Sequence, residues 1–113
     1  MSVSTHGNYT IVAVCGEVDL SNVSFLLEGI DEALTASPEG FAIDLSEVTY
    51  IDSAGIAAIM SAYRRVYPNG RLAVVAADRN VRSVLRLIHL EQLPGIFLLD
   101  TLADAEKALS AAT

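Results

Sequence analysis

A serine lies at the point in the chain where an apolar strand pattern gives way to a helical one. Residues 43–56 run from an apolar segment through a polar turn into Asp52-Ser53-Ala54-Gly55, which is typical of a helix start. The first turn of a helix has backbone N–H groups without partners and the positive end of the helix dipole, so a phosphate on Ser53 would be held there. These residues indicate a modification switch. The alternative is that Asp52 or Ser53 only caps the helix, the commonest role of such residues at this position.

Three aspartates, Asp19, Asp44 and Asp52, follow apolar segments that are predicted to be strands. The C-terminal ends of strands form the edge at which open α/β sheets bind their ligands, so these carboxylates could gather near Ser53. Oxygen ligands suit Mg²⁺, which makes a metal or nucleotide site one interpretation. Solvated acids at strand ends are commoner, however, and we expect no metal site and no bound cofactor.

Hydrolytic chemistry at Ser53 is not predicted. A nucleophile elbow needs glycine two residues before the serine, and position 51 is isoleucine. The sequence has no glycine-rich loop that could cradle a nucleotide phosphate. A catalytic triad needs a histidine, and we interpret His6, in a predicted turn, and His89, far along the chain, as ordinary surface or cap residues. We therefore expect a protein that is not an enzyme.

Composition limits the classes of partner and the compartment. With 113 residues, of which 52% are hydrophobic and 19% charged, the chain can form the core of one domain, which we place at residues 1–113. The formal net charge of −7 argues against a nucleic acid backbone or an anionic membrane as partner. No basic segment precedes an apolar stretch at the N-terminus, and no apolar run approaches 20 residues, so neither export nor a membrane span is predicted.

Cys15 is the single cysteine and lies in an apolar run, so we expect a buried, inert thiol. One cysteine excludes an intrachain disulfide and a multi-cysteine zinc site, and it agrees with a reducing compartment. A cytoplasmic location is therefore expected.

The elements that must position Ser53 follow from hydrophobic periodicity. Residues 3–5 and 9–15 favour β structure and flank the turn-forming His6-Gly7-Asn8, which predicts an antiparallel hairpin. Ser21 is then expected to cap a helix, and residues 41–45 to form the strand that leads to Ser53. The apolar stripe of the first helix has helical spacing and consists of Val23, Leu26, Leu27, Ile30 and Leu34.

The helix that begins at Ser53 is predicted to end before Pro68-Asn69-Gly70. Its predicted buried stripe consists of Ile56, Ile59, Met60, Tyr63 and Tyr67. That orientation leaves small residues on the opposite face, with Arg64 and Arg65 at its far end: Ala54, Ala57, Ala58, Ser61 and Ala62. The high helix propensity of alanine explains such a face without any function. The functional interpretation is that a partner contacts Ala54, Ala57, Ala58 and Ser61 beside Ser53.

The rest of the sequence alternates strands with helices. Residues 71–76 and 96–99 are predicted strands. Two further helical stripes are predicted, one of Val81, Val84, Leu85 and Ile88, the other of Ala105, Ala108, Leu109 and Ala112. Alternation implies right-handed crossovers, so the predicted fold class is α/β, a single domain with a mixed, mostly parallel sheet that opens with an antiparallel hairpin strand, and about four helices.

In four places, in order and over nearly the whole chain, the sequence resembles the STAS domain family. The matching segments are Gly16-Glu17-Val18-Asp19, Asp44-Leu45-Ser46, Asp52-Ser53-Ala54-Gly55-Ile56, and Gly70 to Val75 with Val81 to Leu87. In the family, the third of these is the phosphorylation loop. The chain departs from the family at Ala54, where many relatives have Ser or Thr, at His89, where the third helix commonly ends in Gly, and at Pro94-Gly95, which lengthens the next turn.

The resemblance implies a partner switch in transcription regulation, as in stress response or sporulation. In that switch an unphosphorylated anti-sigma factor antagonist, or anti-anti-sigma factor, binds an anti-sigma factor that is also a serine kinase and so frees the sigma factor. Phosphorylation by the kinase inactivates the antagonist, and a phosphoserine phosphatase is a further partner. The resemblance makes Ser53 the phosphoacceptor, with Asp19, Asp52 and Gly55 shaping its loop. The alternative is a STAS subunit of a transporter or sensor complex that acts as a docking module.

Overall fold

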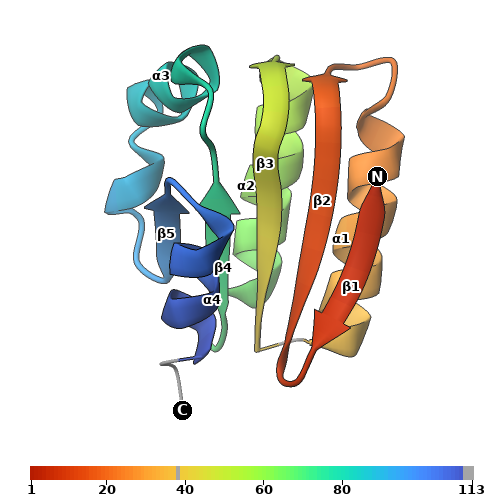
Figure 1. The fold of residues 1–113 in the computed structure, drawn as a ribbon, viewed down its shortest axis with the longest axis vertical. Helices are drawn as coiled ribbons and strands as arrows, with labels where there is room; N and C mark the ends of the chain where they lie inside the picture. Colours follow the sequence, from red (N-terminus) through yellow and green to blue (C-terminus); the bar gives the residue numbers. More distant parts are fainter. Residues whose placement is uncertain (38, 111–113) are drawn as a thin grey trace.

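Five strands form a mixed sheet in the order β1-β2-β3-β4-β5 (Figure 1). The computed structural model describes residues 1–37 and 39–110. β1 pairs antiparallel with β2, and the other three pairings are parallel, as predicted. The elements are β1 (Ser2–His6), β2 (Tyr9–Val18), α1 (Val23–Ala36), β3 (Gly40–Ile51), α2 (Ser53–Val66), β4 (Arg71–Val75), α3 (Arg79–Leu87), the 3-10 turn η1 (Leu90–Gln92), β5 (Ile96–Leu99) and α4 (Leu102–Ser110).

Helices cover the two faces of the sheet unequally. α1, α2 and α3 pack against one face in a core that includes Ile43 and Ile59. α4 packs on the other face through Ala105 and Leu109, and Figure 1 shows it in front of β4 with α2 behind β3. Because β3 and β4 are covered on both faces, their paired segments read as continuous apolar runs in the sequence.

The ends of the chain follow the sequence prediction closely. β1 and β2 are joined through Gly7 and Asn8, and Gly7 has φ +61, in the left-handed region that favours glycine. β5 has the predicted bounds. α4 buries Ala105 and Leu109 as predicted, while Ala112 lies outside the described residues.

β3 is longer than predicted. Residues 46–51, expected to form a polar turn, continue the strand because they pair with the end of β2. The pairing contains two register shifts within residues 13–17 of β2, and Val48 and Ile51 are buried while their polar neighbours face solvent. β4 ends opposite Asp44, so β2 and β3 project beyond it as a two-stranded ribbon. The tip of this ribbon carries the loops that lead into α1 and α2.

α2 is rotated relative to its predicted orientation. Its buried residues are Gly55, Ala58, Ile59, Ala62, Tyr63 and Val66. Ala58 and Ala62, predicted to be exposed, have exposed fractions of 3% and 0%, whereas Tyr67, predicted to be buried, is 45% exposed. The physical reason is that α2 packs on the sheet and also against its neighbour α1 (Figure 1), where small side chains let backbones approach closely. The larger Ile56 and Met60 pack at the edge of the core, half-buried.

Three other burial predictions are wrong. Leu27 of α1 is 38% exposed. Gly29 faces the sheet instead and is buried so close to β2 that a Cβ there would lie 2.7 Å from Val12 Cγ1. Ile88 is 39% exposed because α3 ends one residue before it. Cys15 is exposed because it lies on the projecting ribbon, beyond the part of the sheet that α4 covers.

The longest helices, α1 and α2, have 14 residues each, about 21 Å at the usual helical rise. None of the helices in the described residues is long and apolar enough to cross a membrane.

Candidate functional site

Ser53 is the first residue of α2, and its side chain is exposed. Asp52 is the N-cap: its Oδ1 accepts hydrogen bonds from the backbone N–H groups of Ala54 at 2.9 Å and Gly55 at 3.2 Å. Of the two residues that could cap the helix, Asp52 takes this role. The Ser53 oxygen therefore remains accessible for chemistry.

Asp52 also joins α2 to the loop between β2 and α1. Its Oδ2 accepts a hydrogen bond from the backbone N–H of Leu20 at 3.3 Å. Its own backbone N–H donates to the carbonyl of Val18 at 3.1 Å. One residue thus fixes the two segments that emerge at the tip of the ribbon, which is the geometry that the predicted supporting role of Asp52 requires.

Asp19 organises the loop on the other side of this connection. Its Oδ1 accepts hydrogen bonds from the backbone N–H of Ser21 at 2.9 Å and from the Ser21 hydroxyl. Asn22 closes the loop, because its Oδ1 accepts from the Asp19 N–H at 2.9 Å and its Nδ2 donates to the Glu17 carbonyl at 2.7 Å. The predicted cap at Ser21 is wrong, since α1 begins after Asn22 and the Ser21 hydroxyl is engaged by Asp19.

This network changes the electrostatic argument for a phosphate on Ser53. The N–H groups of Ala54 and Gly55, which the sequence argument left free for a phosphate, already donate to the Asp52 carboxylate. A phosphate on Ser53 would lie beside that carboxylate at the start of the helix. It would stay exposed to an approaching partner unless it displaced Asp52.

Gly55 permits the close approach of α2 to the ribbon. A Cβ at this position would lie 2.5 Å from Ile51 Cγ1 and 3.0 Å from Val18 Cγ1. Any side chain would force the first turn of α2 away from the ends of β2 and β3, and Ser53 would move with it. This contact gives Gly55 a physical basis for its predicted role in shaping the loop.

Asp44 does not join this group. It lies within β3, opposite the last residue of β4, and its Oδ1 accepts from the Ser46 N–H at 3.0 Å. The seven residue steps along the strand from Asp44 to Ile51 span roughly 23 Å. Its predicted position at a strand end is wrong because β3 continues past it. Within residues 1–37 and 39–110 no group of three or more His, Cys, Asp and Glu side chains could hold a metal ion.

The predicted partner surface on α2 is only partly available. Ala57 is exposed, and Ala54 and Ser61 are half-buried, but Ala58 is buried and cannot contact a partner. Two exposed apolar residues that the sequence did not indicate lie in the segments fixed by Asp52: Leu20, 80% exposed, and Tyr50, 50% exposed. Periodicity could not identify them, because neither belongs to an apolar stripe.

Both histidines lie away from these residues. His6 ends β1, where it stacks on Tyr9, and it is exposed. His89 follows α3 with φ 57, a left-handed conformation that glycine adopts more easily. This conformation gives a physical reason for the glycine that the resemblance to the STAS family leads us to expect at the end of the third helix. As predicted, each histidine is a surface residue in the structure.

Comparison with known proteins finds related sequences. The family described as "Mlab, STAS domain" matches residues 1–100. The chain is 31% identical over 105 residues to the anti-sigma-F factor antagonist RsfB of Mycobacterium tuberculosis, and the match covers 93% of this chain and 84% of that protein.

Solved structures show the same fold. The crystal structure of an anti-sigma factor antagonist from Mycobacterium paratuberculosis is 28% identical, with a TM-score of 0.85, and the match covers 96% of this chain and 92% of that one. The phosphorylated form of the Bacillus cell fate determinant SpoIIAA is 17% identical, with a TM-score of 0.71 over 95% of this chain and 96% of that one. At that identity the likeness is one of fold alone.

Proposed function

Because the chain belongs to the STAS domain family, we propose that it is an anti-sigma factor antagonist that is switched off by phosphorylation of Ser53. In its unphosphorylated form it binds an anti-sigma factor with serine kinase activity, and the sigma factor is released. It acts by binding and has no catalytic activity of its own. Its site of action is the cytoplasm, where the sigma factor and the ATP of the kinase are found.

The observation that supports the proposal is that Asp52 and Ser53 have different roles at the start of α2. Asp52 makes the capping bonds, so the Ser53 hydroxyl is exposed and is not needed for folding. A kinase can therefore reach Ser53 Oγ without unfolding α2. The kinase transfers the γ-phosphoryl group of ATP to Oγ, removes the hydroxyl proton and releases ADP. A phosphatase then hydrolyses the phosphoserine with water.

The effect of the phosphate follows from where Ser53 lies. Exposed Ala57 and Leu20 flank it, one on α2 and one on the loop held by Asp52. The modification adds a charge of about −1.5 to −2 to this surface, which raises the cost of desolvating it. A kinase also presents bound nucleotide phosphates to its substrate serine, so phosphoserine meets like charge there. Both effects oppose re-binding.

The proposal is tested with purified anti-sigma factors from the host, each loaded with ADP and titrated by calorimetry. Wild type and Ser53→Ala are expected to bind one of them, and Ser53→Asp to bind it at least about tenfold more weakly, about 1.4 kcal/mol. Ser110→Asp, an exposed serine at the end of α4, is the matched control and should bind like wild type. Absence of binding by wild type to every anti-sigma factor would contradict the proposal.

A further inference from the structure

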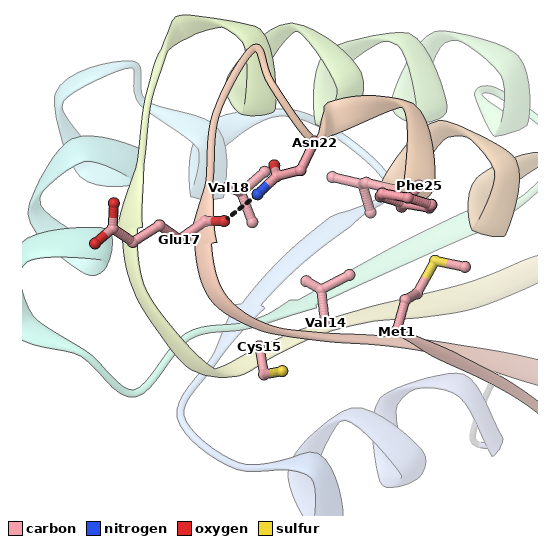
Figure 2. Close-up of a pocket in the computed structure, with 8 residues that line it drawn as sticks. Met1, Val14, Cys15, Glu17, Val18, Asn22 and Phe25 are labelled. Carbon is pink, nitrogen blue, oxygen red and sulfur yellow. Dashed lines mark hydrogen bonds between the residues drawn. The ribbon is translucent and has the colours of Figure 1, made fainter.

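An apolar hollow of about 390 Å³ lies between α1 and β2 (Figure 2). Val14, Val18 and Leu26 line its inner part, and Met1 and Phe25 stand at its opening with exposed fractions of 51% and 59%. Figure 2 shows Phe25 and Met1 on the same side of β2 as Val14, whereas the side chain of Cys15 points away from them. Within the described residues, nothing covers the outer face of Phe25.

Hydrogen bonds within the protein hold the wall of the hollow in place without a partner. Asn22 uses its amide oxygen and its amide nitrogen to bond Asp19 and Glu17 across the loop. The same loop is fixed to α2 through the bond between Leu20 and Asp52. An occupant would therefore meet a formed site, which lowers the entropic cost of binding.

The charged residues at and next to the hollow on α1 and β2 are Glu17 and Glu28. Residues 1–63 contain nine Asp and Glu residues and no Lys or Arg, and all seven basic side chains come later in the chain. Glu17 lines the hollow, and Glu28 lies one helical turn after Phe25 on α1. An apolar centre with Glu17 at its wall and Glu28 nearby on α1 complements an apolar side chain flanked by basic residues.

We propose that this hollow is a second docking surface for the anti-sigma factor, which inserts an apolar side chain flanked by Lys or Arg between Phe25 and Met1. The inference rests on the proposed function and adds a contact to it. This contact lies on α1 and β2 rather than on α2, so it contributes affinity that a phosphate on Ser53 does not block directly. An exposed aromatic ring at the opening suits such a role, because burying it stabilises the complex with little loss of side-chain freedom.

The test uses Phe25→Ala and the anti-sigma factor that binds wild type in the calorimetric screen. The variant should raise Kd at least about tenfold, about 1.4 kcal/mol, with the melting temperature nearly unchanged because Phe25 is already exposed. Leu27→Ala is the matched control: Leu27 is also exposed on α1, does not line the hollow, and should change Kd less than about twofold.

A second experiment reverses an acidic charge near the hollow. Glu28→Lys should weaken binding at least about fivefold in 50 mM salt, and the difference from wild type should shrink in 500 mM salt, since ions screen exposed charges. Glu91→Lys, exposed in η1, is the control and should have no such effect. If Ser53→Asp loses binding but Phe25→Ala and Glu28→Lys keep it, the hollow is not a docking surface and the proposed function stands. If wild type binds no anti-sigma factor, both proposals are overturned.

Discussion

The carboxylate of Asp52 accepts hydrogen bonds from the backbone N–H groups of Leu20, Ala54 and Gly55. Two of these bonds cap α2, and the third fixes the neighbouring loop. Ser53 lies beside this carboxylate but takes no part in the cap. The aspartate therefore maintains the structure, while the serine hydroxyl stays exposed, as the proposed phosphorylation requires.

Comparison of Asp52 with a second N-cap aspartate, Asp78, separates the capping of α2 from the bond to the neighbouring loop. Asp52→Ala should lower the free energy of unfolding by about 1–2 kcal/mol, measured by urea denaturation. Asp78→Ala is the matched control, because Asp78 caps α3 through Asn80 and Val81 but bonds no other loop, and it should cost about 1 kcal/mol. Hydrogen exchange at the Leu20 amide should speed up in Asp52→Ala only. Equal protection of Leu20 in both variants would argue against the connection.

Ser53 should be the single residue that the partner kinase phosphorylates. Its hydroxyl is exposed at the helix start, and Ala54 leaves no second hydroxyl beside it. Incubation with the kinase, ATP and Mg²⁺ should add the mass of one phosphate to wild type and none to Ser53→Ala, by intact mass spectrometry. Peptide mapping should place the phosphate on residue 53. Phosphate on the Ser53→Ala protein would refute the assignment.

At the scale of elements, the two-stranded ribbon formed by β2 and β3 positions the site. The sequence predicted the order of elements, the opening hairpin and the bounds of β5, because these depend on turn residues and on local apolar patterns. It did not predict that β3 runs on to Ile51, since the register shifts in β2 alter the alternation of buried and exposed residues. Ser53 and Asp52 could be found from sequence because a helix start is local. Leu20 could not, since its contact with Asp52 joins residues far apart in the chain.

The orientation of α2 was mispredicted for a related reason. Large apolar residues suggest a buried face, but the helix turns its small residues inward where it packs on the sheet and against α1. Ala58 and Ala62 are buried there, while Ala57 is exposed. Size and polarity alone do not show how closely two backbones approach.

Two neighbouring alanines test this orientation. Ala57→Arg should weaken anti-sigma factor binding about tenfold and leave the melting temperature nearly unchanged, because residue 57 faces solvent beside Ser53. Ala58→Arg should lower stability by at least about 3 kcal/mol or prevent folding, because a charged side chain would enter the core. Circular dichroism and calorimetry distinguish the two effects. A stable Ala58→Arg protein would contradict the orientation of α2.

Phosphorylation should leave the fold intact, because Ser53 is exposed and takes no part in the cap. Backbone amide shifts in NMR should be confined to the segments joined by Asp52, residues 17–22 and 52–57. The largest change is expected at Leu20, Ala54 and Gly55 if the phosphate competes with the Asp52 carboxylate for their N–H groups. Shifts spread over β4, β5 and α4, or a large fall in melting temperature, would show that the switch acts through the fold.

Across the whole molecule, acidic and basic residues are unevenly distributed along the chain. The half of the chain that forms β1, β2, α1 and β3 has acidic side chains but no Lys or Arg, while the basic side chains begin at Arg64. α1 and α2 both start at the end of the sheet where β2 and β3 project (Figure 1). The hollow and Ser53 therefore lie toward the same end of the molecule, which suits a single partner that contacts both, as proposed above.

In the proposed function, phosphorylation of Ser53 decides whether this protein releases a sigma factor. The most direct measurement is the amount of free sigma factor after the purified complex of anti-sigma factor and sigma factor is mixed with the protein. The unphosphorylated protein and Ser53→Ala should release sigma factor in proportion to their concentration, and the Ser53-phosphorylated protein should release none at the same concentrations. Equal release by the phosphorylated and unphosphorylated proteins would show that phosphorylation of Ser53 is not the switch.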